Sequence, residues 1–213
     1  MNYFNKLSSV IVIASVAACG NASDNKLPIL GNKIAQEIVV DGKTIMDTIY
    51  QTVPEFSLLN QDSVVVTNQT VENKIYVADF FFTSCPTICP TMKKELMRVY
   101  AKYKGNNKVA ILSHTIDPDY DNLTVLKDYA DRLDADGKQW MFLRGDRKDV
   151  YDLAEKGYYA SAMVDSTEPG GFIHSGGFIL VDKQQRVRGI YDGTSATDVD
   201  KLMKDMDLLL KEE

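Results

Sequence analysis

Two cysteines four positions apart are the residues of this chain with the clearest chemical potential. They lie in the segment Phe80-Phe81-Phe82-Thr83-Ser84-Cys85-Pro86-Thr87-Ile88-Cys89-Pro90. The preceding stretch is apolar, β-branched and aromatic, which is typical of a buried strand, and Pro90 suits the first turn of a helix. Because the N–H groups and dipole at a helix start favour negative charge, we expect Cys85 and Cys89 to have lowered pKa values and a reactive thiolate form.

The spacing of the two thiols fits reversible chemistry. Positions i and i+4 on a helical turn stand one above the other with a rise of about 6 Å, so both sulfurs can face one point or close a disulfide. Oxidation to a disulfide removes both sulfur ligands, and reduction restores them. A purely structural disulfide is the less favoured alternative, because a bridge across so short a loop removes little entropy from the unfolded chain.

His174 is the third candidate and lies in Gly171-Phe172-Ile173-His174-Ser175-Gly176, near the end of a long glycine-rich loop predicted over 157–175. In a thioredoxin-like arrangement, this loop returns beside the turn that carries Cys85 and Cys89, called the cysteine turn below. Two sulfurs and one imidazole nitrogen can then share an ion. Such a set suits Cu(I), accommodates Cu(II) and, with an open position, also fits a catalytic zinc. The N-terminus predicts that the chain is exported, as described below, and the sequence offers no obvious fourth ligand. Both observations favour copper over zinc.

Other polar residues have simpler interpretations. His114 lies in a predicted strand, and we interpret it as a core or edge histidine rather than a ligand. Asp117, Asp119 and Asp121 resemble the start of a calcium loop, but a proline intervenes and Asn122 occupies the position that requires glycine. Turn and helix-cap roles are therefore favoured for these aspartates.

The pattern of apolar residues predicts an α/β domain. Two hairpins come first, one around Asp41-Gly42 within 38–50 and one that joins 53–58 to 64–66. Predicted strands at 75–82, 109–115 and 141–143 alternate with helices at 90–103, 123–133 and 148–156, followed by strands at 178–182 and 186–191 and a helix at 196–211. Alternation implies parallel crossovers, and the last two strands resemble an antiparallel hairpin. The order predicts a thioredoxin-like fold: a central mixed sheet flanked by helices, with an added N-terminal hairpin.

Composition limits the class of protein. The chain has 213 residues, of which 45% are hydrophobic, and this is enough for one well-buried domain, expected over 34–213. The net charge is -6, and the sequence has no cluster of positive charge of the kind that binds nucleic acid. We therefore do not expect nucleic acid as a partner.

The N-terminus has the pattern of an export signal. Residues 1–18 combine Lys6, a short apolar stretch and small residues, and the apolar stretch is too short to span a bilayer by itself. Val16-Ala17-Ala18-Cys19 resembles the bacterial lipobox, in which the peptide is cut before the cysteine and that cysteine is lipidated; an ordinary secretion signal is the alternative. Residues 19–33 form a polar tether. We expect an exported lipoprotein, anchored to a bacterial membrane through Cys19 and facing the periplasm.

The chain resembles the Sco/SenC family of copper-delivery proteins for cytochrome oxidase assembly. The resemblance covers roughly Pro54 to Leu210 and rests on the cysteine motif, on Asp117-Pro118 after the next strand and on His174 at the loop end. It implies Cys85, Cys89 and His174 as copper ligands, with Asp117 near the copper turn or a partner. It also implies delivery of copper to, or reduction of thiols at, the binuclear copper centre of an oxidase subunit. Other copper chaperones or thioredoxin-like reductants are the further partners expected.

Two classes of function remain open. The favoured one is a metallochaperone that passes copper on by ligand exchange and has no catalytic turnover. The alternative is a membrane-tethered thiol:disulfide oxidoreductase or redox sensor that uses Cys85 and Cys89 without metal. Thioredoxin-type reductases have two residues between their cysteines, whereas this chain has three, and His174 has no obvious redox role. Both observations favour the metallochaperone.

Overall fold

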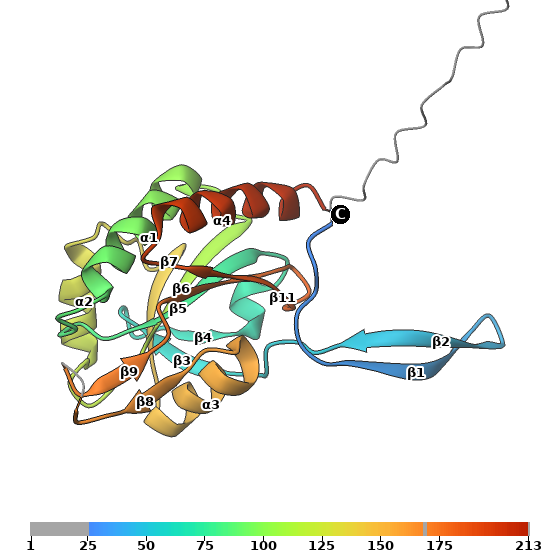
Figure 1. The fold of residues 1–213 in the computed structure, drawn as a ribbon, viewed down its shortest axis with the longest axis horizontal. Helices are drawn as coiled ribbons and strands as arrows, with labels where there is room; N and C mark the ends of the chain where they lie inside the picture. Colours follow the sequence, from blue (N-terminus) through green and yellow to red (C-terminus); the bar gives the residue numbers. More distant parts are fainter. Residues whose placement is uncertain (1–25, 168–169, 213) are drawn as a thin grey trace, which may run out of the picture.

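A seven-stranded mixed sheet, ordered β11-β10-β5-β6-β7-β3-β4, forms the centre of the protein (Figure 1). The computed structural model describes residues 26–167 and 170–212, with only the backbone of Ile173 and His174. The strands of this sheet are β3 (Ser57–Asn60), β4 (Val65–Thr67), β5 (Ile75–Phe81), β6 (Val109–Thr115), β7 (Trp140–Arg144), β10 (Gly177–Val181) and β11 (Val187–Asp192). Strands β5, β6 and β7 are parallel, and the other neighbouring pairs are antiparallel. The predicted mixed sheet is confirmed.

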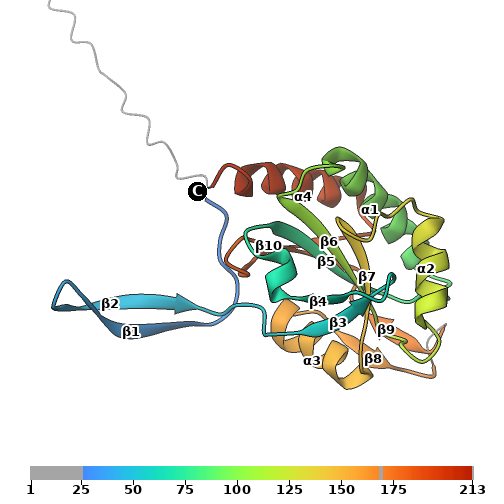
Figure 2. The ribbon, with the colours of Figure 1, turned by 180° about the vertical axis from the view of Figure 1, so that it is seen from behind.

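Helices cover both faces of this sheet (Figures 1 and 2). They are α1 (Cys89–Tyr103), α2 (Leu123–Asp131), α3 (Arg147–Tyr158) and α4 (Ala196–Leu209), and a short 3₁₀ helix, η1 (Asn68–Val71), follows β4. Every residue of β5 is buried, and its side chains alternate between the faces. Phe81 packs on Tyr129 of α2, whereas Phe80 packs on Tyr158 of α3. Helix α4 lies against α1 and β11. The two aromatic clusters therefore fill the core on opposite sides of the parallel strands.

The loop predicted over 157–175 is the main departure from the expected elements. It contains β8 (Ala162–Val164) and β9 (Phe172–His174), which pair with each other in a separate antiparallel ribbon. Each strand has three residues, which is too short for an alternation of apolar and polar residues to be recognised in the sequence. The prediction of a structureless loop was therefore wrong.

The predicted N-terminal hairpin is present and projects from the body (Figures 1 and 2). Its strands are β1 (Lys33–Val40) and β2 (Lys43–Tyr50). Asp41 and Gly42 join them with φ angles of 51° and 75°. Positive φ angles at both positions are what a two-residue hairpin turn needs in order to match the twist of the strands. The strands are longer than predicted, because the polar residues between their apolar positions still pair along the ladder.

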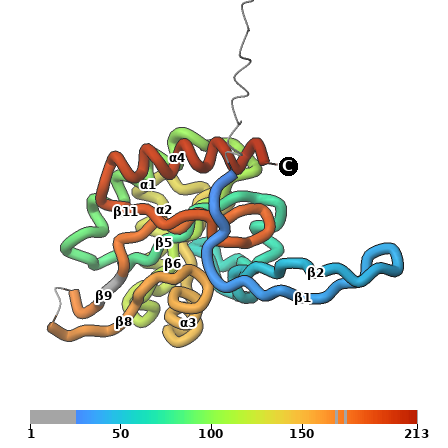
Figure 3. The backbone as a smooth tube through the Cα atoms, turned by 45° about the vertical axis from the view of Figure 1, so that its right-hand side comes forward, coloured from blue at the N-terminus to red at the C-terminus, as the bar shows by residue number. Residues whose placement is uncertain are grey.

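Residues before the hairpin lie along the end of β11 (Figure 3). The Leu30 N–H donates to the Val187 carbonyl at 2.8 Å, and the Arg188 guanidinium donates to the carbonyls of Leu27 and Pro28. Arg188 also pairs with Glu212 beyond α4. Residues 27–30 and Glu212 are thus held together at one end of the body.

The predicted signal segment 1–18 and the lipidation site Cys19 lie outside the described residues. Within 26–167 and 170–212, no helix has both the length and the apolar character that crossing a membrane requires.

His114 is a core histidine, as predicted. Its side chain is fully buried on β6, stacks on Phe80 with ring centroids 5.0 Å apart, and places Nδ1 3.2 Å from the Asp79 carbonyl. Its Nε2 has no hydrogen-bond partner among the described residues. Burial lowers the pKa of His114 from 6.5 to about 4, against the smaller opposing effect of the hydrogen bond to Asp79. The imidazole is therefore neutral in the folded protein.

The buried imidazole predicts a pH-dependent stability difference in a His114→Phe variant. The unfolded chain takes up a proton at this position as the pH falls through 6.5, whereas the folded chain does so only near pH 4. From pH 7 to pH 4.5, the wild-type protein should lose about 2 to 3 kcal/mol of stability that the variant does not lose. Urea unfolding at both pH values measures this difference, and an equal gap between the two proteins at both pH values contradicts the prediction.

Candidate functional site

Cys85 and Cys89 occupy the junction between β5 and α1. Strand β5 ends at Phe81, and α1 begins at Cys89 with Pro90 in its first turn. The Cys85 N–H donates to the Phe82 carbonyl at 3.2 Å, which bends the chain between strand and helix. The cysteines are 9% and 5% exposed and are not joined by a disulfide in this structure. The predicted strand-to-helix turn is therefore present, with both thiols at the edge of the core.

The electrostatic surroundings of Cys89 differ from the prediction. Its hydrogen bond with the Cys85 thiol, followed by burial, raises the pKa of the Cys89 thiol. These effects outweigh the lowering by a backbone hydrogen bond with Phe82, so the predicted lowering of the pKa was wrong for Cys89. The Cys89 thiol therefore keeps its proton at neutral pH until an ion or an oxidant displaces it. Two sulfurs close enough to share a hydrogen bond are also placed to bind one ion or, after a small shift, to form a disulfide.

A buried polar chain lies next to Cys89. Asp79 and Cys89 both line a cavity of about 10 Å³, which has room for at most one water molecule. The Asp79 carboxylate accepts a hydrogen bond from the Ser113 hydroxyl at 2.6 Å, and that hydroxyl accepts one from the Trp140 indole N–H at 3.0 Å. Negative charge on Asp79 adds a smaller contribution to the raised pKa of Cys89. This chain of contacts fixes a carboxylate in the core behind the cysteine turn.

Asp121 connects the cysteine turn to the neighbouring strand. Its carboxylate, which is fully buried, accepts hydrogen bonds from the Thr83 N–H at 3.1 Å, from the Thr83 hydroxyl and from the Thr115 hydroxyl. Burial raises the pKa of Asp121, and the threonine hydrogen bonds oppose this shift. Sequence reasoning considered only turn and cap roles for Asp121, whereas Asn122 is the residue that caps α2. The sequence signal that could have indicated this role is the pair Thr83 and Thr115, because Thr83 follows β5 and Thr115 ends the adjacent strand β6.

Asp117 lies at the same end of the sheet but does not bond to the cysteine turn in the described contacts. Its carboxylate lies 3.5 Å from a guanidinium nitrogen of Arg147, and its N–H donates to the Thr115 hydroxyl. A position near the copper turn stays a prediction for Asp117.

The segment 170–176, which contains β9, lies beside the cysteine turn. A Cβ at Gly170 would lie 3.1 Å from Cδ of Pro86, and a Cβ at Gly176 would lie 3.4 Å from Cδ1 of Ile88. His174 lies between these two glycines, in β9, so the structure brings its backbone alongside the segment that holds both cysteines. Among the described side chains, which exclude that of His174, no group of three His, Cys, Asp or Glu is placed to hold a metal ion. The role of His174 therefore stays a prediction.

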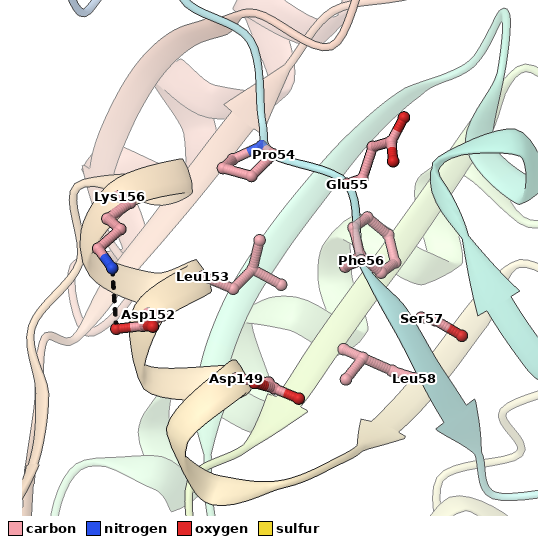
Figure 4. Close-up of a pocket in the computed structure, with 9 residues that line it drawn as sticks. All are labelled: Pro54, Glu55, Phe56, Ser57, Leu58, Asp149, Asp152, Leu153 and Lys156. Atoms are coloured by element: carbon pink, nitrogen blue, oxygen red, sulfur yellow. Dashed lines mark ion pairs between the residues drawn. The ribbon is translucent and has the colours of Figure 1, made fainter.

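A second hollow of the surface lies between α3 and β3 and has a volume of about 320 Å³ (Figure 4). Phe56, Leu58 and Leu153 form its apolar floor, and Asp152 at its rim is paired with Lys156 at 3.1 Å. None of the candidate residues lines it. Its composition offers no thiol or imidazole, so we assign it no part in the candidate chemistry.

Comparison with known proteins gives consistent matches. The family model described as SCO1/SenC matches residues 46–211. The SCO1 protein homolog of Bacillus subtilis (strain 168) is 30% identical over 167 residues, which are 78% of this chain and 86% of that protein. The crystal structure of a SCO1/SenC family lipoprotein from Bacillus anthracis str. Ames has a TM-score of 0.69 and 27% identity, over 75% of this chain and 95% of that one. The structure of BsSco, a Sco-family cytochrome c oxidase assembly protein with a disulfide switch, has a TM-score of 0.67 and 29% identity, over 76% and 95%.

The contacts of Asp121 predict that an Asp121→Ala variant loosens the cysteine turn. Three donors lose their acceptor, so the free energy of unfolding should fall by about 2 to 3 kcal/mol. Amide hydrogen exchange at Thr83 and Cys85 should accelerate more than exchange in β6. Asp128→Ala, which removes an exposed carboxylate of α2, is the control and should change stability by less than about 0.5 kcal/mol. Unaltered exchange around Thr83 in Asp121→Ala contradicts the prediction.

Proposed function

The chain belongs to the SCO1/SenC family, and on this premise we propose that it is a copper-binding assembly protein. The thiolates of Cys85 and Cys89 and the imidazole of His174 hold the ion. The protein passes copper to the binuclear copper centre of a cytochrome c oxidase subunit, or reduces the thiols of that centre. The observation that carries the proposal is the pair of hydrogen-bonded thiols on a turn beside which the segment of His174 lies.

The donor set fits copper on chemical grounds. Thiolate sulfur is a soft ligand that selects Cu(I), and imidazole suits both copper oxidation states. Since the Cys89 thiol has a raised pKa, copper must displace its proton, and the apparent affinity should increase with pH.

Redox control follows from the same two sulfurs. When the pair is oxidised to a disulfide, two thiols lose two electrons and two protons to an oxidant, and both sulfur ligands are lost. Reduction by a dithiol partner reverses the step. The disulfide switch of BsSco supports this part of the proposal, because that relative is 29% identical over 76% of this chain.

The alternative function is thiol:disulfide exchange or redox sensing without metal. The adjacent thiols in a thioredoxin-like fold support it, since such chemistry needs only the pair. We prefer copper binding, and the closeness of Gly170 to Pro86 and of Gly176 to Ile88, on either side of His174, supports this preference.

We further propose export and membrane attachment through a lipid on Cys19. The lipobox-like residues before Cys19 support this, as does the SCO1/SenC family lipoprotein of Bacillus anthracis. The domain then stays in the periplasm while the tether holds it near the membrane.

A copper titration of the reduced full-length protein tests the proposal. The wild-type protein should bind one Cu(I) in competition with a chelator, and Cys85→Ala and His174→Ala should each weaken binding by at least about 10- to 100-fold. Met163→Leu is the control, because it removes an exposed soft sulfur one register position from the Ala162–His174 pair. Undiminished binding in His174→Ala overturns the ligand role of His174. Absence of copper binding together with catalytic disulfide reduction favours the alternative function.

A further inference from the structure

Phe172 connects the β8–β9 ribbon to two other parts of the protein. It is the first residue of β9, and its ring lies 5.1 Å from the ring of Phe82, centroid to centroid, at an interplanar angle of 53°. Phe82 immediately precedes the cysteine turn. The guanidinium carbon of Arg147 lies over the same Phe172 ring, 5.6 Å from its centroid. The ring is therefore in contact with both Phe82 and Arg147.

Arg147 is itself held by two carboxylates. It is the first residue of α3, and its Nη2 lies 2.6 Å from Asp119 and 3.5 Å from Asp117. Both aspartates follow β6, at the end of the sheet where the cysteine turn begins. A planar guanidinium with carboxylates at its edge and an aromatic ring at its face has a defined orientation.

Close packing of Gly170 adds to this contact. Gly170 has a φ of 92°, and a Cβ there would lie 2.9 Å from Cζ of Phe82. A side chain is therefore excluded at this position, and the backbone at Gly170, in the loop between β8 and β9, lies directly on Phe82 and Pro86. The ribbon has no ladder to the seven-stranded sheet in the described part of the chain. The two-residue connection to β10 and the contacts of β8 with α3 fix where the ribbon begins and ends. The contacts of Phe172 and Gly170 are those that hold it against Phe82 and Pro86.

We propose that Arg147 is a positioning residue that holds Phe172 against Phe82 and so fixes the distance between β9 and the cysteine turn. The inference rests on the proposed function, because its consequence is the affinity for copper. Arg147 acts through His174: when the guanidinium contact is lost, β9 moves more freely and the imidazole spends less time at the ion. Asp117 then influences the site through Arg147 rather than by touching the ion.

Amide hydrogen exchange of the reduced, metal-free full-length protein tests the structural step. In Arg147→Met, exchange at Phe172 and His174 should accelerate roughly 3- to 10-fold, because both the cation–π contact and the ion pairs are lost. Arg147→Lys keeps the charge but not the flat surface, and its effect should be intermediate. Arg132→Met is the matched control, since Arg132 also pairs with an aspartate and lies over an aromatic ring, both on α2.

Copper affinity tests the functional step. Arg147→Met should weaken Cu(I) binding by about 10-fold, within the range observed for residues that orient metal ligands, while Arg132→Met leaves it unchanged. In a His174→Ala background, Arg147→Met should have no further effect, because the imidazole through which it acts is gone. Phe172→Leu, which removes the ring but keeps an apolar side chain, should reproduce the loss if Arg147→Met folds poorly.

Three outcomes overturn the inference: unchanged exchange in β9, unchanged affinity in both Arg147→Met and Phe172→Leu, or an equal loss of affinity with and without His174. Failure of the proposed function is distinguishable from these. If the wild-type protein binds no copper, the proposed function fails, and with it the predicted effect on affinity. Exchange at Phe172 then still decides whether Arg147 holds β9.

Discussion

The carboxylate of Asp121 joins the ends of two parallel strands, and the cysteine turn starts from this junction. Thr83 follows β5 and Thr115 ends β6, and both donate to the same buried group. Because parallel strands end at the same edge of a sheet, a single acceptor can hold both chain segments as they leave it. The first cysteine follows Thr83 by two positions, so its place in space depends on this contact.

The two thiols are buried, although the binding of a metal ion requires their charged thiolate form. A soft metal ion binds thiolates, yet the surroundings of Cys89 favour the protonated form. The energy needed to remove the proton must therefore come from the bond that the sulfur forms. Loss of the Cys89 proton would therefore accompany either metal binding or oxidation of this thiol.

The sequence alone was sufficient to predict the strands that are buried on both faces of the sheet. The predicted strand 109–115 matches β6, and β5 differs by one residue, because continuous apolar runs bounded by polar residues have few alternative structures. The predicted helices agree within a few residues at their ends. The short strands β8 and β9 were missed because three residues do not establish a period. His174 was singled out by its place near the end of the loop in a thioredoxin-like order, and the family resemblance then implied its role as a ligand.

The site was predictable in its residues and less so in its surroundings. Cys85 and Cys89 were found from their types and spacing, but the direction of the Cys89 pKa depends on a sulfur contact that spacing does not specify. The contact between Arg147 and Phe172 joins a helix to a separate ribbon, so no local pattern could reveal it. Asp121 was assigned to a turn or helix end because aspartate is common there, and its burial became evident only in three dimensions.

Arg188 donates hydrogen bonds to the carbonyls of Leu27 and Pro28 and forms an ion pair with Glu212, and these contacts have a practical consequence. They bring residues 27–28 and Glu212 together at the start of β11, whereas the other end of that strand, at Asp192, adjoins Gly176 and Gly177 beside the cysteine turn. A purification tag, a fluorophore or a surface linkage at the C-terminus is therefore directed away from the thiols. Immobilised protein should present its cysteine face unobstructed to a partner in solution.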